Sequence, residues 1–284
     1  MECAPGKLLT MDPQLANARN HLLLGTSSFT AAGWEKTFYS PGLDKSEYLR
    51  FYAQEFPTVE LDVTFYRVPS ARMIESWYAK TPPGFILAAK TPQTITHEKP
   101  LVECREEMEQ FVGMMRGLRE KLGPILLQFP YFNKKAFSSA QGFMARLDPF
   151  LASLPKGPRY AVEIRNKWWI SPTFMELLRG HGVAFTLIDH PWMHPPGDLF
   201  KRLDPITADF NYIRWLGDRK GIEEQTNSWD KVIVDRGAEL KSWVDLCEPI
   251  RQRGVTIYGY VNNHYSGHAP ATVRRLLELF DSGR

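Results

Sequence analysis

The stretch VELDVTFYRVPS, residues 59–70, alternates apolar and polar side chains over its first eight positions. The apolar set is Val59, Leu61, Val63 and Phe65, and the polar set is Glu60, Asp62, Thr64 and Tyr66. This alternation predicts a strand over residues 58–66, because successive side chains of a strand point to opposite faces. One face of the strand is therefore apolar and the other carries two carboxylates. Whether those carboxylates are exposed to solvent or buried in the protein interior depends on the fold.

Strands and helices are predicted to alternate along the rest of the chain. Seven further short apolar runs predict strands at residues 21–29, 85–92, 124–130, 160–166, 183–190, 210–217 and 255–263. Segments with a helical period lie between most of them, at residues 46–56, 71–81, 104–122, 172–182, 228–254 and 269–280, whereas the proline-rich segment 190–205 predicts a loop. Eight such units predict parallel pairing and a closed (β/α)₈ barrel, the TIM-barrel fold. The absence of a GxGxxG motif after the first strand disfavours an open dinucleotide-binding sheet.

The composition is that of an ordinary globular chain, with 284 residues of which 43% are hydrophobic. We expect residues 1–20 to form an N-terminal extension and residues 21–284 a single barrel domain. The net charge of +3 is too close to neutral to indicate a nucleic-acid binder by itself. Cys3, Cys104 and Cys247 are scattered, which is typical of a reducing compartment. With neither a signal peptide nor an apolar run of spanning length, a cytoplasmic protein without membrane contact is expected.

In a closed barrel, the apolar face of each strand packs on the helices and the polar face looks inward, so the acids of residues 59–70 are expected inside. The same argument places these side chains of the other strands inside: Ile86, Ala88, Lys90, Leu126, Gln128, Ala161, Glu163, Arg165, Leu187, Asp189, Tyr212, Arg214, Leu216, Tyr258, Tyr260 and Asn262. The polar side chain comes late in nearly every strand. Late positions lie at the C-terminal mouth, where barrel enzymes hold their active sites.

The numbers of acidic and basic side chains expected inside the barrel are nearly equal. The acids are Glu60, Asp62, Glu163 and Asp189, and the bases are Lys90, Arg165 and Arg214. Because an isolated buried charge is costly, these groups are expected to form a hydrogen-bonded ring. Two interpretations remain open: the ring lines a ligand pocket, or it fills the barrel as a structural network of ion pairs.

Seven segments of this chain resemble, in order, those of one family. The segments are GTSSFTAAGWEKTFYSPGL (25–43), VELDVTFYRVPS (59–70), FILAAKTPQTITH (85–97), GPILLQFP (123–130), YAVEIRNKWW (160–169), RWLG (214–217) and VNNHYSGHAPATVRRL (261–276). Together they resemble the DUF72 (YecE-like) family over residues 22–281. The resemblance implies a TIM barrel and no particular activity. The chain departs from the family pattern at Asp62, where Asn is usual, at RWLG in place of Arg-x-His-Gly, and at His268, where a small residue is common.

The predicted function is that of an enzyme acting on a phosphate-bearing or sugar-like small molecule by acid–base chemistry, of the hydrolase or lyase type. The catalytic candidates are Glu163 and Asp189 as acid and base, Lys90 as an electrostatic stabiliser, and Glu60. The substrate-binding candidates are Arg165, Arg214, Asp62, Tyr66, Gln128, Asn262, Asn263, Trp169 and Tyr260. Within this set, Arg214, Gly217 and residues 262–264 predict an anion-binding corner beside the start of the last helix.

Several alternatives accompany this prediction. Aromatic side chains expected near the mouth could stack on a base or a sugar, or pack in the core: Trp34, Tyr66, Trp168, Trp169, Trp192, Trp215, Tyr260 and Tyr265. No cofactor is predicted; His97, His190 and His264 could hold a divalent metal with Glu163 and Asp189, but no HxH or HExxH spacing supports this. A small, anionic ligand is the expected partner. The rival functions are an endonuclease IV-like phosphodiesterase that binds nucleic acid, and a non-catalytic ligand-binding barrel.

Overall fold

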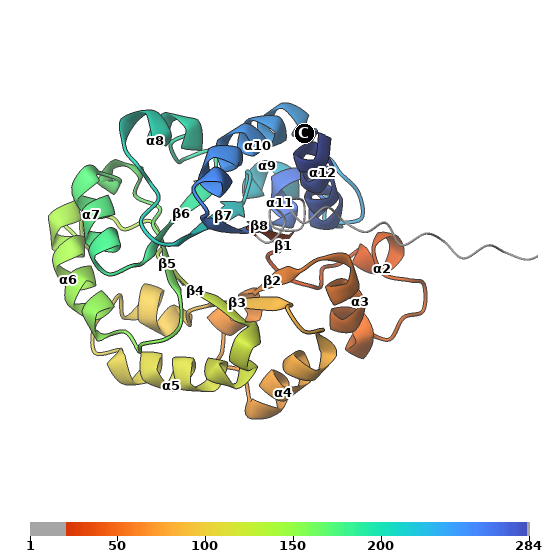
Figure 1. Cartoon of the computed structure of the whole chain (residues 1–284), viewed down its shortest axis with the longest axis horizontal. Coiled ribbons are helices and arrows are strands. Elements are labelled where there is room, and N and C mark those ends of the chain that lie inside the picture. Colours follow the sequence, from red (N-terminus) through yellow and green to blue (C-terminus); the bar gives the residue numbers. More distant parts are fainter. Residues whose placement is uncertain (1–20, 283–284) are drawn as a thin grey trace, which may run out of the picture.

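The structure, a computed structural model, describes residues 21–282, and within them eight parallel strands form a ring surrounded by helices (Figure 1). The strands are β1 (Leu22–Thr26), β2 (Thr58–Leu61), β3 (Ile86–Lys90), β4 (Leu122–Gln128), β5 (Tyr160–Glu163), β6 (Ala184–Asp189), β7 (Phe210–Trp215) and β8 (Thr256–Val261). Their order is β1-β8-β7-β6-β5-β4-β3-β2, and every hydrogen-bonded pair is parallel. The predicted TIM barrel is therefore confirmed, whereas the predicted extension, residues 1–20, lies outside the described residues.

Helices connect the strands and cover the outside of the ring. The α-helices are α2 (Trp34–Thr37), α3 (Tyr48–Glu55), α4 (Ala71–Lys80), α5 (Arg105–Met115), α6 (Ala140–Ser153), α7 (Pro172–Gly180), α8 (Pro196–Arg202), α9 (Arg219–Glu223), α10 (Gly237–Gln252), α11 (Asn263–Ser266) and α12 (Ala269–Ser282). Shorter turns are η1 (Lys45–Glu47), η2 (Asp62–Phe65), η4 (Arg116–Lys121) and η5 (Lys167–Trp169), all 3₁₀, and the π-helix η3 (Thr94–Glu98). Serine hydroxyls cap several helices; Ser70, for example, accepts from the N–H of Met73 at the start of α4.

Five of these helices were not predicted: α2, α6, α8, α9 and α11. The segment expected to be a proline-rich loop contains α8, because its prolines occupy the first turn, where a missing N–H costs nothing. Leu199 of α8 is buried. Helix α6 begins after Ser139, whose hydroxyl accepts from the N–H of Gly142, and it buries Phe143 and Leu147.

Strand β2 ends earlier than its sequence pattern predicts. After Leu61 the chain enters the 3₁₀ turn η2, and the hydroxyl of Thr64 ties this turn to β3 by accepting from the N–H of Lys90 at 2.9 Å. Tyr66 was predicted to point into the barrel, but it lies outside, and 68% of it is exposed. Glu60, inside β2, is fully buried and faces inward as expected.

The hydroxyl of Tyr52 links β1 to β2, where the ring closes. It accepts from the N–H of Thr26 at 2.8 Å and donates to the carbonyl of Thr58 at 3.1 Å. Gly25 makes the close approach of these strands feasible, because a Cβ at this position would lie 2.0 Å from the Thr58 carbonyl oxygen. A side chain of α3 thus satisfies backbone groups that neighbouring strands satisfy elsewhere in the ring.

The buried apolar residues form two layers. The inner cluster fills the barrel and consists of Ala88, Leu126, Ala161, Ala184, Phe210, Tyr212, Tyr258 and Tyr260, and the outer cluster lies between strands and helices. The predicted facing of β3, β4, β5 and β8 agrees with this inner cluster. The prediction for β6 was inverted, since Ala184 lies in the inner cluster and Leu187 in the outer one. Leu216, which follows β7, also packs in the outer cluster instead of the barrel.

Candidate functional site

A network of buried charges lies across the barrel near the C-terminal ends of the strands. Arg214 of β7 donates to Glu60 of β2 at 2.8 Å and to Glu163 of β5 at 2.9 Å. Tyr212 donates to the second oxygen of Glu60 at 2.6 Å, and Arg165 donates to the second oxygen of Glu163 at 2.7 Å. The sequence predicted that Glu60, Glu163, Arg165 and Arg214 meet, and the structure brings them together. Each carboxylate oxygen in this network has a donor from the chain itself.

The network holds its members in fixed charge states. Burial raises the pKa of the Glu163 carboxyl, but the guanidinium groups of Arg165 and Arg214 outweigh burial and lower it to about 2. Burial and the charge of Glu60 raise the pKa of Tyr212 well above its ordinary value, so this phenol stays protonated. An ion pair of this kind sets geometry and charge; a carboxyl with such a low pKa does not release or take up protons near neutral pH.

Lys90 lies beside the network at the end of β3. Its ammonium group is 3.2 Å from Oδ1 of Asp62 and 4.0 Å from the ring centre of Phe65, and only 7% of the residue is exposed. Burial, followed by the charge of Arg214, lowers the pKa of Lys90, and Asp62 offsets only part of this effect. Lys90 therefore loses its proton more readily than an exposed lysine does.

Two half-buried histidines flank the same region. His97 lies in the π-helix η3, its ring edge packs on Phe65 at 4.8 Å between centroids, and burial together with the charge of Lys90 lowers its pKa to about 4. His190 follows β6, and burial together with Arg165 lowers its pKa. Both imidazoles are therefore neutral near pH 7. The sequence predicted both histidines only as possible metal ligands. Their positions beside Lys90 and Arg165 could not be predicted, because no periodic sequence pattern leads to them.

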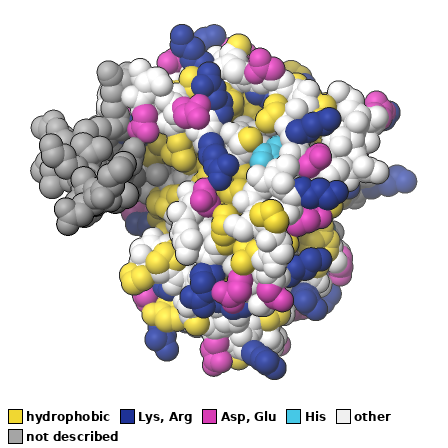
Figure 2. Space-filling view, turned by 90° about the vertical axis from the view of Figure 1, so that its right-hand side faces the viewer, with side chains coloured by type: hydrophobic (Ala, Val, Ile, Leu, Met, Phe, Trp, Pro, Cys, Tyr) yellow, Lys and Arg dark blue, Asp and Glu magenta, His cyan; other side chains and the backbone are white. Residues whose placement is uncertain are grey.

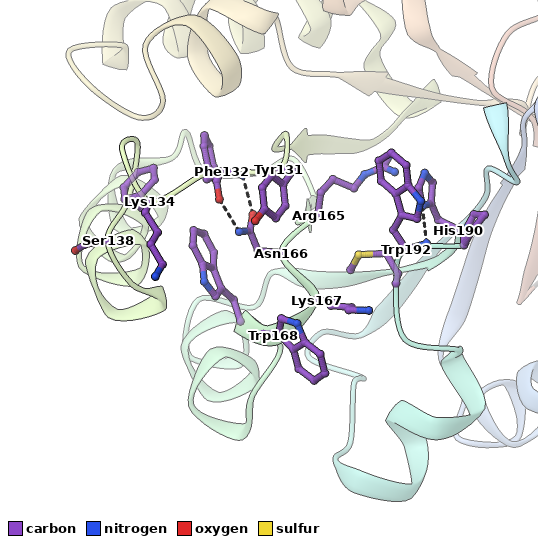
Figure 3. A pocket seen from close by; sticks show the side chains of 14 residues that line it. Tyr131, Phe132, Lys134, Ser138, Arg165, Asn166, Lys167, Trp168, His190 and Trp192 are labelled. Atoms are coloured by element: carbon purple, nitrogen blue, oxygen red, sulfur yellow. Dashed lines mark hydrogen bonds between the residues drawn. The ribbon is translucent and has the colours of Figure 1, made fainter. Parts of the chain in front are cut away.

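A cavity of about 740 Å³ opens beside Arg165, over the ends of β4, β5 and β6 (Figure 3). Its lining residues come from the loops that follow these strands: Tyr131, Phe132, Lys134, Phe137, Ser138, Arg165, Asn166, Lys167, Trp168, Trp169, His190, Pro191, Trp192 and Met193. Figure 3 shows Arg165 extending toward His190 and Trp192. The tryptophans were predicted from the sequence, whereas residues 131–138 were not, because an irregular loop has no periodic sequence pattern.

Asp189 does not point into the barrel, contrary to the predicted register. Its carboxylate accepts from the indole N–H of Trp243 on α10 at 2.7 Å and from the hydroxyl of Tyr265 on α11 at 3.0 Å. Its side chain therefore faces the helices outside the strand. This carboxylate joins two outer helices to the end of β6, and it does not bind Arg214.

The predicted anion-binding corner is occupied by side chains of the chain itself. Asn262 caps α11 by accepting from the N–H of His264 at 3.0 Å, and Asn263 accepts from the N–H of Ala269 at 3.0 Å. The next free amide of α12, that of Ala271, donates to a ring nitrogen of His268. The N–H groups of His264, Ala269 and Ala271 therefore already have acceptors within the protein.

Three further substrate-binding candidates have partners within the protein. Tyr260 is fully buried, and its hydroxyl lies 2.9 Å from that of Thr58. The amide of Gln128 donates to the carbonyl of Phe129 at 2.8 Å. Trp169 stacks on Phe143 with ring centres 5.3 Å apart, and it forms part of the cavity wall. Of the three, Trp169 alone borders the cavity.

The described residues, 21–282, contain no group of three or more His, Cys, Asp or Glu side chains arranged to hold a metal ion. His264, the third histidine proposed as a ligand, lies 2.9 Å from Glu223 and near Trp229. Over the same residues, none of the helices combines the length and apolar character needed to span a membrane. On the face drawn in Figure 2, basic and acidic side chains are interspersed.

The barrel and the charged groups at its mouth define the chain as a TIM-barrel protein with a candidate site at the C-terminal ends of the strands. The family model for DUF72, a protein of unknown function, matches residues 23–284, and the chain belongs to this family.

Relatives of known name and structure agree with this membership. The chain is 26% identical over 268 residues to the UPF0759 protein YunF of Bacillus subtilis, covering 88% of this chain and 93% of YunF. It is 31% identical over 151 residues to the UPF0759 protein YecE of Escherichia coli, covering 51% of this chain and 53% of YecE. A DUF72 family crystal structure from Thermotoga maritima is 29% identical with a TM-score of 0.68, covering 92% of this chain and 98% of that one. These names state no activity.

Proposed function

We propose that the protein is an enzyme that binds a small anionic molecule at the barrel mouth and acts on it by proton transfer. The observation that carries this proposal is the position of Lys90, a buried lysine with a lowered pKa that lies at the end of a barrel strand. Lysines with lowered pKa values are well suited to acid–base catalysis near neutral pH. The ends of barrel strands are also where catalytic groups of this fold lie.

Arg165 supplies the binding site for the anion. Its Nε and Nη2 atoms are both directed at one oxygen of Glu163, at 2.7 and 2.6 Å, so the guanidinium is held in one orientation. Among the described residues, no acceptor binds its Nη1. The side chain is 21% exposed and borders the cavity. A phosphate or carboxylate therefore meets a cation that is already oriented, which favours binding and lowers the entropic cost.

The neighbouring groups divide the remaining tasks. Lys90 transfers the proton, and the neutral imidazoles of His97 and His190 form hydrogen bonds with the substrate. Glu60 and Glu163, predicted from sequence as catalytic, are assigned here to positioning, because every carboxylate oxygen is already bound within the network. The class of reaction that fits is hydrolysis or elimination on a phosphate- or carboxylate-bearing molecule.

The test is a screen of sugar phosphates and phosphomonoesters with product detection by mass spectrometry. A substrate found with the wild-type protein should lose about 10²–10⁴-fold in kcat with Lys90→Met, as is typical for the loss of a proton-transfer group. Lys135→Met is the matched control, since Lys135 is exposed and lies outside the cavity lining. Arg165→Met should raise KM more than it lowers kcat.

Thermal melts of each variant show whether a loss of activity reflects unfolding. Binding of the same compounds without turnover would contradict the proposal and favour a ligand-binding barrel. Turnover that is unchanged in Lys90→Met would contradict the role assigned to that lysine.

A further inference from the structure

The geometry points to a nucleotide-like ligand: the cavity beside Arg165 receives a planar aromatic ring whose attached phosphate reaches Arg165. This inference rests on the proposed function for the anionic group, and it adds the class of molecule that carries that group. The cavity is of suitable size, since its volume of about 740 Å³ lies within the range of small-molecule sites, roughly 300–1,000 Å³.

Three large aromatic side chains border the cavity and remain exposed. Trp168 and Trp192 are each 76% exposed, and Tyr131 is 69% exposed. Aromatic residues that pack in a core are buried, as Trp34 and Trp215 are in this protein. Exposed aromatic surface gathered around one concavity is typical of a ligand site, because an aromatic ring can stack on it and displace water.

The wall behind these side chains is rigid. Asn166 accepts from the N–H of Phe132 at 2.9 Å and donates to the carbonyl of the same residue at 2.8 Å, so it joins the end of β5 to the loop after β4 (Figure 3). Trp169 stacks on both Phe132 and Phe143, with ring centres 6.2 and 5.3 Å away, and these two phenylalanines also contact each other. The cavity is therefore formed before a ligand arrives, which reduces the entropic cost of binding.

The charges around the cavity favour an anion. Its lining contains the cations Lys134, Arg165 and Lys167 and no Asp or Glu. The ammonium of Lys167 lies 5.2 Å from the ring centre of Trp168, so cationic and aromatic surfaces adjoin. A ring with an attached phosphate matches both surfaces at once.

The same lining argues against a free sugar as the main occupant. A sugar presents many hydroxyl groups that need acceptors, and carboxylates are the strongest acceptors that proteins offer. The lining has no carboxylate, and the amide of Asn166 is already bound to Phe132. A flat ring needs a stacking surface instead, which Trp168 and Trp192 provide.

The test uses isothermal titration of the full chain with adenosine 5′-monophosphate, adenosine and ribose 5-phosphate. The monophosphate should bind at least about tenfold more tightly than either fragment, because it alone reaches both surfaces. Trp168→Ala and Trp192→Ala should each weaken it by about 5- to 100-fold, the range of base stacking, and should leave ribose 5-phosphate unchanged. Lys134→Ala should weaken it as well, and Lys135→Ala, beside it but outside the lining, should not.

The variants separate this inference from the proposed function. Equal affinity for the monophosphate and ribose 5-phosphate, with no effect of the tryptophan variants, would contradict the binding of an aromatic ring in the cavity. It would still be consistent with the binding of an anion by Arg165. A loss in Trp168→Ala without a loss in Arg165→Met would overturn the anion site and retain the ring site. Undetectable binding of the monophosphate at several millimolar, or much tighter binding of a single-stranded oligonucleotide, would overturn the nucleotide-sized ligand. Circular dichroism of each variant distinguishes lost binding from lost fold.

Discussion

Arg214 and Glu163 lie side by side inside the barrel, with Nη1 of the arginine 2.9 Å from Oε2 of the glutamate and neither side chain more than 4% exposed. The same guanidinium binds Glu60 through its other terminal nitrogen, Nη2, at 2.8 Å. Arg214 therefore pairs with two buried carboxylates, and Arg165 supplies the second positive charge that balances them. This relationship fixes the orientation of Arg165, on which the proposed anion site depends.

Glu163→Gln should destabilise the protein by about 3–5 kcal/mol, because removing one partner leaves a buried charge without full compensation. The free energy of unfolding in urea measures this change. Glu47→Gln removes a surface ion pair with Arg50, whose side chains are 41% and 54% exposed, and should cost less than about 1 kcal/mol. Equal costs for the two variants would show that the buried pair contributes no more than the exposed one.

Stability should also fall in acid because of Glu163. Its pKa is about 2 in the folded protein and 4.5 ordinarily, so its contribution is complete above pH 4.5 and is lost as the pH falls toward 2. The difference corresponds to about 3 kcal/mol. Urea unfolding between pH 6 and pH 3 tests the window, with Glu163→Gln as the control that should show a flatter dependence. A wild-type protein as stable at pH 3 as at pH 6 would contradict the assignment.

Tyr52→Phe should weaken the closure of the barrel between β1 and β2. Without the hydroxyl, the N–H of Thr26 and the carbonyl of Thr58 lose a buried partner, at a cost of about 1–3 kcal/mol. Tyr48→Phe is the control, since among the described residues its hydroxyl has no partner and its ring stacks on Tyr39. It should change stability by less than about 0.5 kcal/mol. Hydrogen exchange at the amide of Thr26 should quicken in Tyr52→Phe only.

Gly217→Ala should distort the mouth beside α11. Gly217 has φ of +68°, and a Cβ there would lie 2.4 Å from the carbonyl oxygen of His264. Gly42 also has a positive φ, of +76°, but no atom lies within 4 Å of its Cβ position. Gly217→Ala should therefore cost about 1–3 kcal/mol more than Gly42→Ala, which carries only the backbone strain. Thermal unfolding of the two variants gives the comparison, and equal melting temperatures would count against the close approach.

The sequence predicted the barrel well because strand and helix periods alternate clearly along the chain. It also predicted correctly which side chains of β2 face the barrel interior. Charged residues stand at every second position there, so only one of the two alternating sets of side chains is apolar and can pack on the helices. In β6, with the sequence AFTLID, both alternating sets of side chains contain apolar residues, as expected for a strand covered on both faces. The sequence therefore did not show which set faces the barrel interior, and Leu187 and Asp189 were wrongly predicted to lie inside. Helix α8 was missed because its prolines were interpreted as loop residues.

The site was less predictable than the fold. The meeting of Glu60, Glu163 and Arg214 follows from strand order and late position, which the sequence shows. The place of His97 depends on a π-helix, and that of Tyr131 on an irregular loop, and neither has a periodic signature. Whether a carboxylate is free or bound also depends on distances, which residue types do not reveal.

The most direct test of the account is the titration of Lys90 by NMR, with lysine labelled at Cε with ¹³C and the signal assigned by its absence in Lys90→Arg. Proton transfer at the mouth requires a lysine whose pKa lies below the ordinary value of 10.5, as burial beside Arg214 predicts. A titration midpoint below 10.5 that shifts when adenosine 5′-monophosphate is added would support the account. A midpoint at or above 10.5 that does not respond to the ligand would contradict it.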